Sequence, residues 1–413
     1  MSSGATALEV DVAIVGGGMV GASLAVALAG TQRSLLLLES VPFGTDAQPS
    51  FDERTTALGN ASRRIFEGLA VWPAIAAQAA AIRTIHVSEA GRFGCARLEA
   101  REQGVEAFGY VAANRRIGAA LWQKLAAQGQ LHLRVPAHAQ EVEIGAADVR
   151  FAVAGGSGQP EPVRARLVVA ADGAHSQIRA AAGITADVED YGQVAVVANV
   201  AADRPHQECA FERFTGEGPL AVLPLFDGRF AVIWACHPGQ AAQLLALDDA
   251  AYLARLQRQF GWRAGRFVAV SRRGSYPLKL TRAAATTGQR TVLIGNAAQA
   301  LHPVAGQGFN LGLRDAAMLA ELLAADGARD PGAAELLDTF SAWRARDRAG
   351  VVRFTDGLVK LFADRRPGAA LLRDLGLLMF DLAPPAKSAL ARVSLGFGGP
   401  APRLARGLPV RHA

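Results

Sequence analysis

The segment Thr291–Asp315, TVLIGNAAQALHPVAGQGFNLGLRD, has the residue types of a binding site for a flat, polar ligand. Its apolar start is typical of a short buried strand, the pair Gly295-Asn296 turns the chain, and a helical pattern begins near Gly308. Pro303 and Gly306 lie between the strand and the helix. Glycines let backbone N–H groups approach a ligand, and a helix N-terminus directs partial positive charge at it. This arrangement suits a flavin, whose reduced ring carries negative charge.

A second glycine motif lies near the N-terminus, where Gly16, Gly18 and Gly21 fit the pattern G-x-G-x-x-G between an apolar strand and a helix. The first glycine makes the turn, the second lets a pyrophosphate approach, and the third lets helix and strand pack closely. Glu39 follows at about the 20-residue spacing of the acidic residue that accepts a ribose hydroxyl. The carboxylate disfavours a 2′-phosphate, so FAD or NAD fits this site and NADP does not.

The choice between FAD and NAD depends on two later pairs, Asp172-Gly173 after an apolar strand and Gly295-Asn296. A plain NAD dehydrogenase needs neither pair, so the combination favours FAD. Asp172 has a second interpretation as a helix cap. Arg179 lies shortly after this motif.

The elements that must position these residues predict an α/β fold. We expect an FAD-binding, Rossmann-like fold, an inserted substrate domain with an antiparallel sheet (an α+β region), and C-terminal helices. The nucleotide-binding domain is expected in three parts, 1–82, 114–186 and 286–355. The substrate domain is expected at 83–113 and 187–285, and a helical segment at 356–413. Within these limits we expect a helix at 57–69 and meander strands at 131–135, 141–144 and 149–153.

Composition narrows the classes of function. The net charge is +6 over 413 residues, and no basic stripe interleaved with aromatic residues indicates nucleic-acid binding. The three cysteines Cys95, Cys209 and Cys236 form no CxxC pair, so neither a metal site nor a disulfide framework is expected, and the compartment is expected to be a reducing cytoplasm. Val12–Gln32 lacks charged residues, but its glycines divide it into a strand and a helix, which argues against a membrane span.

The three motifs in this order resemble those of the single-component FAD-dependent aromatic hydroxylases. Further segments, FDERTTAL at 51–58, FERFTGEGPLAVLPL at 211–225 and HP at 237–238, are similar to the ubiquinone-biosynthesis hydroxylases over roughly residues 10–400. The broad family has aspartate after Gly295, whereas this chain has Asn296. An amide still hydrogen-bonds a ribityl hydroxyl, and Asn296 resembles the branch that acts on the 2-octaprenyl-6-methoxyphenol ring.

The resemblance implies roles for further residues. Arg54 is expected near the flavin and the nicotinamide phosphates, and Pro303 at the edge of the flavin ring. Gly306, Gly308 and Asn310 complete the expected cofactor site. Arg115, with Arg116 beside it, either contacts the flavin ribityl chain or is an ordinary surface residue. His302 is either a proton relay or a packed histidine. His237 and Tyr276 are either substrate-side groups or core residues, and His175 is expected to be structural.

The reaction that the resemblance implies is hydroxylation of an electron-rich phenol. NAD(P)H reduces bound FAD, O2 is the co-substrate, and a flavin hydroperoxide delivers the oxygen atom. The implied substrate is 2-polyprenyl-6-methoxyphenol, and the product is the 1,4-benzoquinol, with the new hydroxyl para to the existing one. The substrate's own hydroxyl and methoxy groups activate the ring, so a strong acid–base pair is not required.

Other functions fit the same fold. The alternatives are another ring hydroxylase of the ubiquinone pathway, a flavin-dependent reductase of prenyl double bonds, a halogenase, and a non-catalytic prenyl-binding protein. The chain lacks a W-x-W-x-I-P signature, which weighs against a halogenase, and it keeps the flavin motifs that a binding protein generally loses.

A polyprenyl substrate is a lipid, and this leads to expectations about the location of the protein and its binding partners. The chain is expected in the cytoplasm, either in contact with the inner face of the membrane or within a complex of ubiquinone-biosynthesis enzymes. The segment 357–399 alternates apolar clusters with basic residues, so it is expected either to lie at the membrane surface or to pack on the substrate domain or a partner enzyme.

Overall fold

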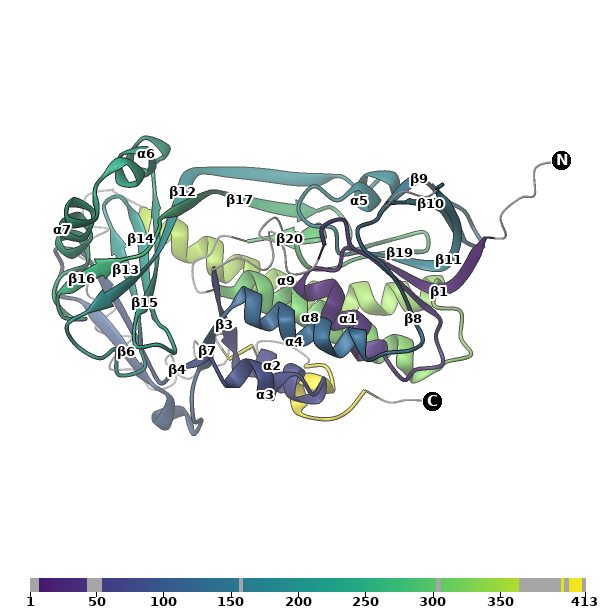
Figure 1. Ribbon diagram of the computed structural model, residues 1–413, viewed down its shortest axis with the longest axis horizontal. Helices are drawn as coiled ribbons and strands as arrows, with labels where there is room; N and C mark the ends of the chain where they lie inside the picture. Colours follow the sequence, from purple (N-terminus) through teal and green to yellow (C-terminus); the bar gives the residue numbers. More distant parts are fainter. Residues whose placement is uncertain are drawn as a thin grey trace.

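The computed structural model describes residues 7–42, 54–155, 159–301, 306–363, 395–396 and 401–410, with side chains described up to residue 350 and again from 395. Three sheets organise these residues (Figure 1). The predicted α/β fold, with a mixed β region beside a Rossmann-like half, is confirmed.

The first sheet has a parallel core in the order β19-β11-β1-β2-β8, which is the nucleotide-binding arrangement. The antiparallel strands β10 and β9 extend from β11, and β18 pairs with β19. The strands are β1 (Leu8–Val15), β2 (Leu35–Leu38), β8 (Leu131–Arg134), β9 (His138–Ile144), β10 (Val149–Ala154), β11 (Glu161–Ala170), β18 (Thr287–Gly288) and β19 (Thr291–Leu293).

Helices α1 (Met19–Leu28), α4 (Asn114–Ala126) and α8 (Gln307–Ala325) cover one face of this sheet (Figure 1). Apolar side chains of these helices and of the parallel strands form one buried core, which includes Ile14, Leu24 and Leu121. The opposite face packs against β9, β10 and the short helix α5 (Gln177–Ala181). Helix α9 (Ala334–Ala363) packs along α8.

The second sheet has the order β20-β17-β12-β15-β14-β13-β5-β6, and β16 pairs with β12. Its strands are β5 (Thr84–Glu89), β6 (Cys95–Glu99), β12 (Ala186–Ala202), β13 (Cys209–Thr215), β14 (Gly218–Pro224), β15 (Phe230–Cys236), β16 (Phe267–Val270), β17 (Gly274–Ala283) and β20 (Gln299–Ala300). Helices α6 (Pro238–Ala246) and α7 (Asp249–Phe260) cover its outer face. We call this sheet the substrate sheet, and its opposite face the inner face.

Strands β12 and β17 pair along most of their length and connect the two halves of the molecule (Figure 1). The register between them shifts between Asp190 and Gln193, at a bulge where Gly192 has a positive φ of 62°. The predicted boundary after residue 186 falls at the start of β12. The domain limits given by the sequence remain predictions.

A small third sheet, β3 (Thr55–Gly59), β7 (Gly109–Ala113) and β4 (Ala80–Ile82), lies between the two halves with α2 (Asn60–Gly68) and α3 (Trp72–Ala76) beside it (Figure 1). The expected helix at 57–69 is wrong at its start, because residues 57–59 pair with β7. The expected meander is also corrected: β8 joins the parallel sheet beside β2, and only β9 and β10 run antiparallel.

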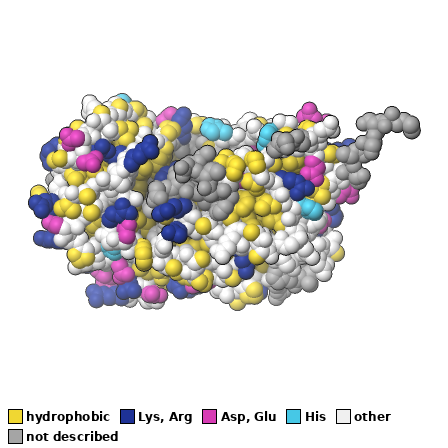
Figure 2. Space-filling view, viewed as in Figure 1, with side chains coloured by type: hydrophobic (Ala, Val, Ile, Leu, Met, Phe, Trp, Pro, Cys, Tyr) yellow, Lys and Arg dark blue, Asp and Glu magenta, His cyan; other side chains and the backbone are white. Residues whose placement is uncertain are grey.

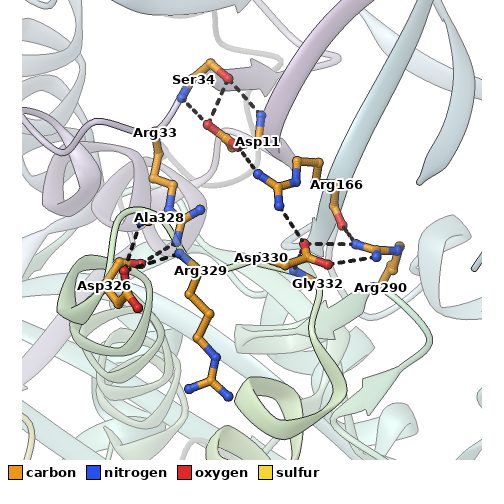
Figure 3. Close-up of polar contacts among 10 residues, drawn as sticks. All are labelled: Asp11, Arg33, Ser34, Arg166, Arg290, Asp326, Ala328, Arg329, Asp330 and Gly332. Carbon is orange, nitrogen blue, oxygen red and sulfur yellow. Dashed lines mark hydrogen bonds and ion pairs between the residues drawn. The ribbon is translucent and has the colours of Figure 1, made fainter. Parts of the chain in front are cut away.

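Ion pairs hold the end of the parallel sheet that faces away from the motif turns (Figure 3). Asp330, in the loop between α8 and α9, pairs with Arg290 at 2.8 Å and Arg166 at 3.4 Å, and Arg166 reaches Asp11 at 3.2 Å. Hydrogen bonding from Arg290 lowers the pKa of Asp330 below its ordinary value. These pairs fix β1, β11 and the start of β19 relative to one another, so the opposite strand ends are held in register.

Candidate active site

The first glycine motif forms the predicted turn between a strand and a helix, and the packing of this chain gives a steric reason for Gly16 and Gly21. Gly16 has a φ of 106°, and a Cβ there would lie 2.4 Å from the Ala171 carbonyl oxygen. A Cβ on Gly21 would lie 1.9 Å from the Gly16 carbonyl oxygen, so only glycine lets α1 pack against this turn. Gly18 is the N-cap residue of α1 and carries no capping side chain, which leaves the first N–H groups of the helix open to a phosphate.

Glu39 lies directly after β2, where its side chain is 7% exposed. One carboxylate oxygen accepts a hydrogen bond from the Gly17 N–H at 2.8 Å, and the other accepts one from the Val41 N–H at 2.9 Å. The oxygen that faces Val41 also accepts from Ser40 Oγ at 3.4 Å, whereas the oxygen that faces Gly17 has a further acceptor position. The backbone therefore fixes the orientation of the carboxylate and leaves it able to accept a ribose hydroxyl.

Asp172 follows β11. The sequence predicts two alternative roles for it, a ligand contact and a helix cap, and its two carboxylate oxygens differ in their surroundings. One oxygen, Oδ2, caps α5 by accepting hydrogen bonds from Gln177 N–H at 2.8 Å and Ile178 N–H at 3.2 Å. The other oxygen, Oδ1, is buried without a hydrogen-bond partner among the described residues. A buried carboxylate oxygen needs a donor, so this atom indicates that a ligand hydroxyl completes the site. Gly173 has a φ of 87°, which glycine adopts freely.

Arg179 connects this turn to the turn that carries Gly295 and Asn296. Its guanidinium donates to the Ala174 carbonyl oxygen at 2.8 Å and to the Ala297 carbonyl oxygen at 2.9 Å. Two motifs that are far apart in the sequence thus form one wall. His175, on the first turn, is exposed.

Gly295 and Asn296 lie in a short 3-10 turn directly after β19. Gly295 has a φ of 58°, and its N–H donates to the Asp315 carboxylate at 3.1 Å. A Cβ on Gly312 would lie 2.8 Å from the Gly295 Cα, so α8 packs directly on this turn. The Asn296 side chain is exposed, and its amide is available to a ligand.

Helix α8 begins after Gly306, which has a left-handed φ of 60°. A Cβ on Gly308 would contact only Leu301 Cβ, at an ordinary 3.9 Å, so packing within the described residues does not require glycine there. The helix is 19 residues long, and its first N–H groups carry partial positive charge. This end of α8 can stabilise the negative charge of a reduced flavin.

The predicted cofactor contact of the Asn310 side chain is corrected by its surroundings. Its oxygen accepts from Gly59 N–H at 2.9 Å and Ser62 Oγ at 2.6 Å, and its nitrogen donates to the Ala57 and Gly306 carbonyl oxygens. All donors and acceptors of the amide are used. The Asn310 side chain therefore joins β3 and α2 to the start of α8 and has no free donor or acceptor for a ligand.

Arg54 and Tyr276, predicted separately, lie together. The Arg54 Cζ is 5.5 Å from the centre of the Tyr276 ring, a cation–π arrangement. Tyr276 is on β17 and packs with Ala195 and Ala235 on the inner face of the substrate sheet. The Arg54 carbonyl accepts from Asn114 N–H at the start of α4, so the same region holds Arg115 and Arg116, both of which are exposed.

His237 does not share this position. It is exposed at the N-terminus of α6, where its Nδ1 accepts from the Gly239 N–H at 3.3 Å and Gln240 completes a capping box. Helix α6 packs on the outer face of the substrate sheet, so His237 is a helix cap and the expected substrate contact is corrected. His302 and Pro303 lie outside the described residues, and their roles remain predictions.

A buried ion network, which the sequence analysis did not single out, supports the Gly295 turn. Asp315 on α8 accepts from Gly295 N–H, from the Gln299 amide at 2.9 Å, and from Arg344 Nε at 2.6 Å. Arg344 on α9 also pairs with Asp347, which Arg314 contacts at 2.8 Å. Burial would raise the pKa of Asp347, but the two arginines hold it below its ordinary value. An acidic residue inside an apolar helix, as in Arg314-Asp315, is the sequence signal for such a network.

These residues fit a flavin dinucleotide. The α1 N-terminus and Glu39 would hold a pyrophosphate and a ribose, and the α8 N-terminus would supply partial positive charge for the ring. Asp172 Oδ1, which has no partner among the described residues, and the exposed Asn296 amide would hydrogen-bond a hydroxylated linker.

Comparison with known proteins agrees with this geometry. The FAD binding domain family matches residues 9–355. Ubiquinone hydroxylase UbiL of Rhodospirillum rubrum is 36% identical over 406 residues, covering 97% of this chain and 93% of that protein. The 3-demethoxyubiquinol 3-hydroxylase of Escherichia coli is 32% identical, covering 94% and 98%.

Solved structures show the same fold. The p-nitrophenol 4-monooxygenase PnpA of Pseudomonas putida superposes with a TM-score of 0.78 at 19% identity, covering 95% of this chain and 99% of that one. The flavin-dependent monooxygenase PieE, in complex with FAD and substrate, has a TM-score of 0.69 at 19% identity, covering 95% and 73%. The chain therefore belongs to the FAD binding domain family and is an FAD-dependent aromatic monooxygenase.

Proposed function

We propose that this enzyme hydroxylates the ring of a polyprenyl phenol during ubiquinone biosynthesis. The observation that carries the proposal is its 36% identity to a ubiquinone hydroxylase over 97% of the chain, together with a second relative, of similar coverage, that also acts on a ubiquinone precursor by name. The preferred substrate is 2-polyprenyl-6-methoxyphenol, and the product is the corresponding 1,4-benzoquinol.

The residues of this chain bind FAD, orient it and shield the reacting ring from water. When bound, FAD supplies the redox chemistry, accepting electrons from NAD(P)H and transferring one oxygen atom of O2 to the ring. The α8 N-terminus stabilises negative charge at the ring, and the Asp172 and Gly295 turns orient the cofactor. The inner face of the substrate sheet excludes water from the other side, with Tyr276 and Arg54 at its β17 edge.

NAD(P)H is the proposed reductant. On the face drawn in Figure 2, Lys and Arg side chains gather between the part that carries α6 and α7 and the part that carries β1 and α1, beside a hydrophobic area. Arg54 lies between the two halves of the molecule, above Tyr276. This distribution of charge supports the approach of a phosphate-bearing dinucleotide.

The experiment that tests the function is a deletion in the native host, grown with oxygen, followed by profiling of prenylated quinones. We expect loss of ubiquinone and accumulation of 2-polyprenyl-6-methoxyphenol, both reversed by the wild-type gene. Accumulation of a later, already para-hydroxylated intermediate would assign the enzyme to another ring position. An unchanged ubiquinone level would refute the function.

The polyprenyl tail leads to a proposal on partners. The enzyme meets its substrate either at a membrane surface or within an assembly of pathway enzymes. No helix among the described residues is both long and apolar enough to cross a membrane. Flotation of the full chain with and without liposomes separates the two: co-migration with lipid supports membrane contact, and co-purification with other pathway enzymes from lipid-free extract supports an assembly.

A further inference from the structure

A single carboxylate interrupts an apolar row on the inner face of the substrate sheet. Glu212 on β13 lies between Val87 on β5 and Ala221 on β14, and the row continues to Ile233 on β15 and Val197 on β12. Neighbouring strands are about 4.8 Å apart, so the row spans about 19 Å. A surface of this length can accommodate an aromatic ring and the first part of a prenyl chain.

The two faces of the sheet differ in packing around this row. The neighbour of Glu212 in sequence, Phe211, points to the outer face and is buried in the core beneath α6 and α7 with Val222 and Trp234. In contrast, every member of the inner row keeps part of its accessible surface. Apolar side chains that retain accessible surface on a face turned toward the other half of the molecule are available to an apolar ligand.

This face of the sheet adjoins the proposed flavin site. Ala210, two residues before Glu212 on the same face, packs in one cluster with Ala57 of β3 and Val111 of β7. The Ala57 carbonyl accepts a hydrogen bond from Asn310 in the first turn of α8, which is the helix end assigned to the flavin ring. The inner row therefore faces the part of the molecule that carries the start of α8.

Glu212 has no hydrogen bond or ion pair with any described residue, and its side chain is only partly exposed. Burial raises its pKa from the ordinary value of 4.5 to about 7, and no nearby charge contributes. The charged and titratable groups on the same face are Glu89, on β5, and Tyr276 with Arg54 at the β17 edge. Arg213 points to the other face, where it donates to the Gln259 carbonyl oxygen.

We propose that Glu212 is the substrate-binding group that accepts a hydrogen bond from the hydroxyl of the phenol ring. A lone polar group in an apolar pocket fixes the orientation of a ligand that has one matching polar group. With the hydroxyl held at Glu212, the para carbon points away from the carboxylate, and the prenyl chain, which is attached ortho to the hydroxyl, starts beside Glu212 and follows the apolar row. This inference rests on the proposed function and assigns its orientation-determining residue.

The test compares binding of a short-tailed 2-methoxy-6-alkylphenol with that of its methyl ether, which lacks the donor hydrogen. Binding to the FAD-loaded enzyme is followed through the flavin absorbance, without NAD(P)H, over a pH series that spans 7. The wild type should bind the phenol about tenfold more tightly than the ether, as expected for a hydrogen bond to a charged group. This preference should decrease as the pH falls through about 7, because protonation removes the charge.

Glu212→Gln should weaken the preference, because its amide oxygen still accepts a hydrogen bond but carries no charge, and it should lose the pH dependence. Glu212→Asp, which keeps the carboxylate, should retain the pH dependence. Glu143→Gln, at an exposed position on β9, is the matched control and should behave as the wild type. A wild-type preference that survives in Glu212→Gln overturns the inference and leaves the function intact. A wild type that neither binds nor hydroxylates the phenol refutes the proposed function, and the inference with it.

Discussion

Replacing Asp315 by asparagine tests the link between the buried ion network and the flavin turn. The Asp315 side chain is 5% exposed, and its two oxygens accept three hydrogen bonds, from Gly295, Gln299 and Arg344. Asparagine has one acceptor oxygen, so its amino group must face a donor on one side. The substitution also removes one of the two carboxylates that neutralise Arg344, whose side chain is 1% exposed.

The magnitude follows from this geometry. Removing one partner of a buried ion pair costs about 3–5 kcal/mol. Asp347 still neutralises part of the Arg344 charge, so we expect the lower end, a decrease of about 3 kcal/mol in the free energy of unfolding. That is a large part of the total stability of a typical domain, which is about 5–15 kcal/mol. The charged Arg344 is the stronger donor, so the asparagine oxygen should face Arg344 and the amino group should face Gly295 N–H, which then loses its acceptor; FAD affinity should therefore also fall.

The assay is urea unfolding at neutral pH, combined with measurement of bound FAD after gel filtration. Glu335→Gln is the control, because the Arg329–Glu335 pair has side chains 42% and 87% exposed and should contribute less than about 1 kcal/mol. A stability loss for Asp315→Asn no larger than that of the control would refute the energetic reasoning. A large loss with unchanged FAD retention would refute the link to the Gly295 turn.

Three further predictions concern the site. Gly21→Ala should prevent FAD retention, because its Cβ would overlap the Gly16 carbonyl, whereas Gly129→Ala, which meets no atom within 4 Å, should retain FAD on gel filtration. Asp172→Ala should weaken FAD binding at least tenfold in a fluorescence titration, whereas Ser176→Ala, which removes only an α5 cap, should leave it near the wild-type value. Burial raises the pKa of Glu212 from 4.5 to about 7, so the free energy of unfolding of the wild type should fall as the pH rises through that range, by at most about 3 kcal/mol. Urea unfolding of Glu212→Gln should show no such fall. Equal pH profiles for the two proteins would contradict this prediction.

The nucleotide-binding motif could be predicted from the sequence because its residues are separated by fixed, short spacings. Gly21 is required by its contact with Gly16 within one strand-turn-helix unit, Gly16 has a positive φ at the turn, and Glu39 lies at the end of the next strand. Sequence spacing therefore located this part of the site without any knowledge of tertiary contacts.

Residues whose roles depend on distant partners were harder to predict. The Asn310 amide is used by β3 and α2, which lie some 250 residues earlier in the chain, and nothing local reveals this. The error at residues 57–59 has the same origin, because only pairing with β7 makes that segment a strand. His237 did have a local signal, since proline follows it and Gln240 lies at the third helical position, the pattern of a capping box.

Glu212 is an intermediate case. Side chains alternate between the two faces of a strand, so Glu212 shares a face with Ala210 and Phe211 points to the other face. The face on which Glu212 lies relative to its neighbours therefore follows from the sequence. Which face turns toward the flavin half does not. That information comes from β3 and β7, which reach the substrate sheet through contacts among Ala57, Val111 and Ala210.

The ribbon formed by β12 and β17 has a mechanical consequence for catalysis. A paired two-stranded ribbon resists bending along its length, and it bends most easily where the ladder is interrupted. In this ribbon the interruption lies at Asp190–Gln193, next to the positive-φ Gly192. A change in tilt between the substrate sheet and the flavin half would therefore bend the ribbon at this bulge.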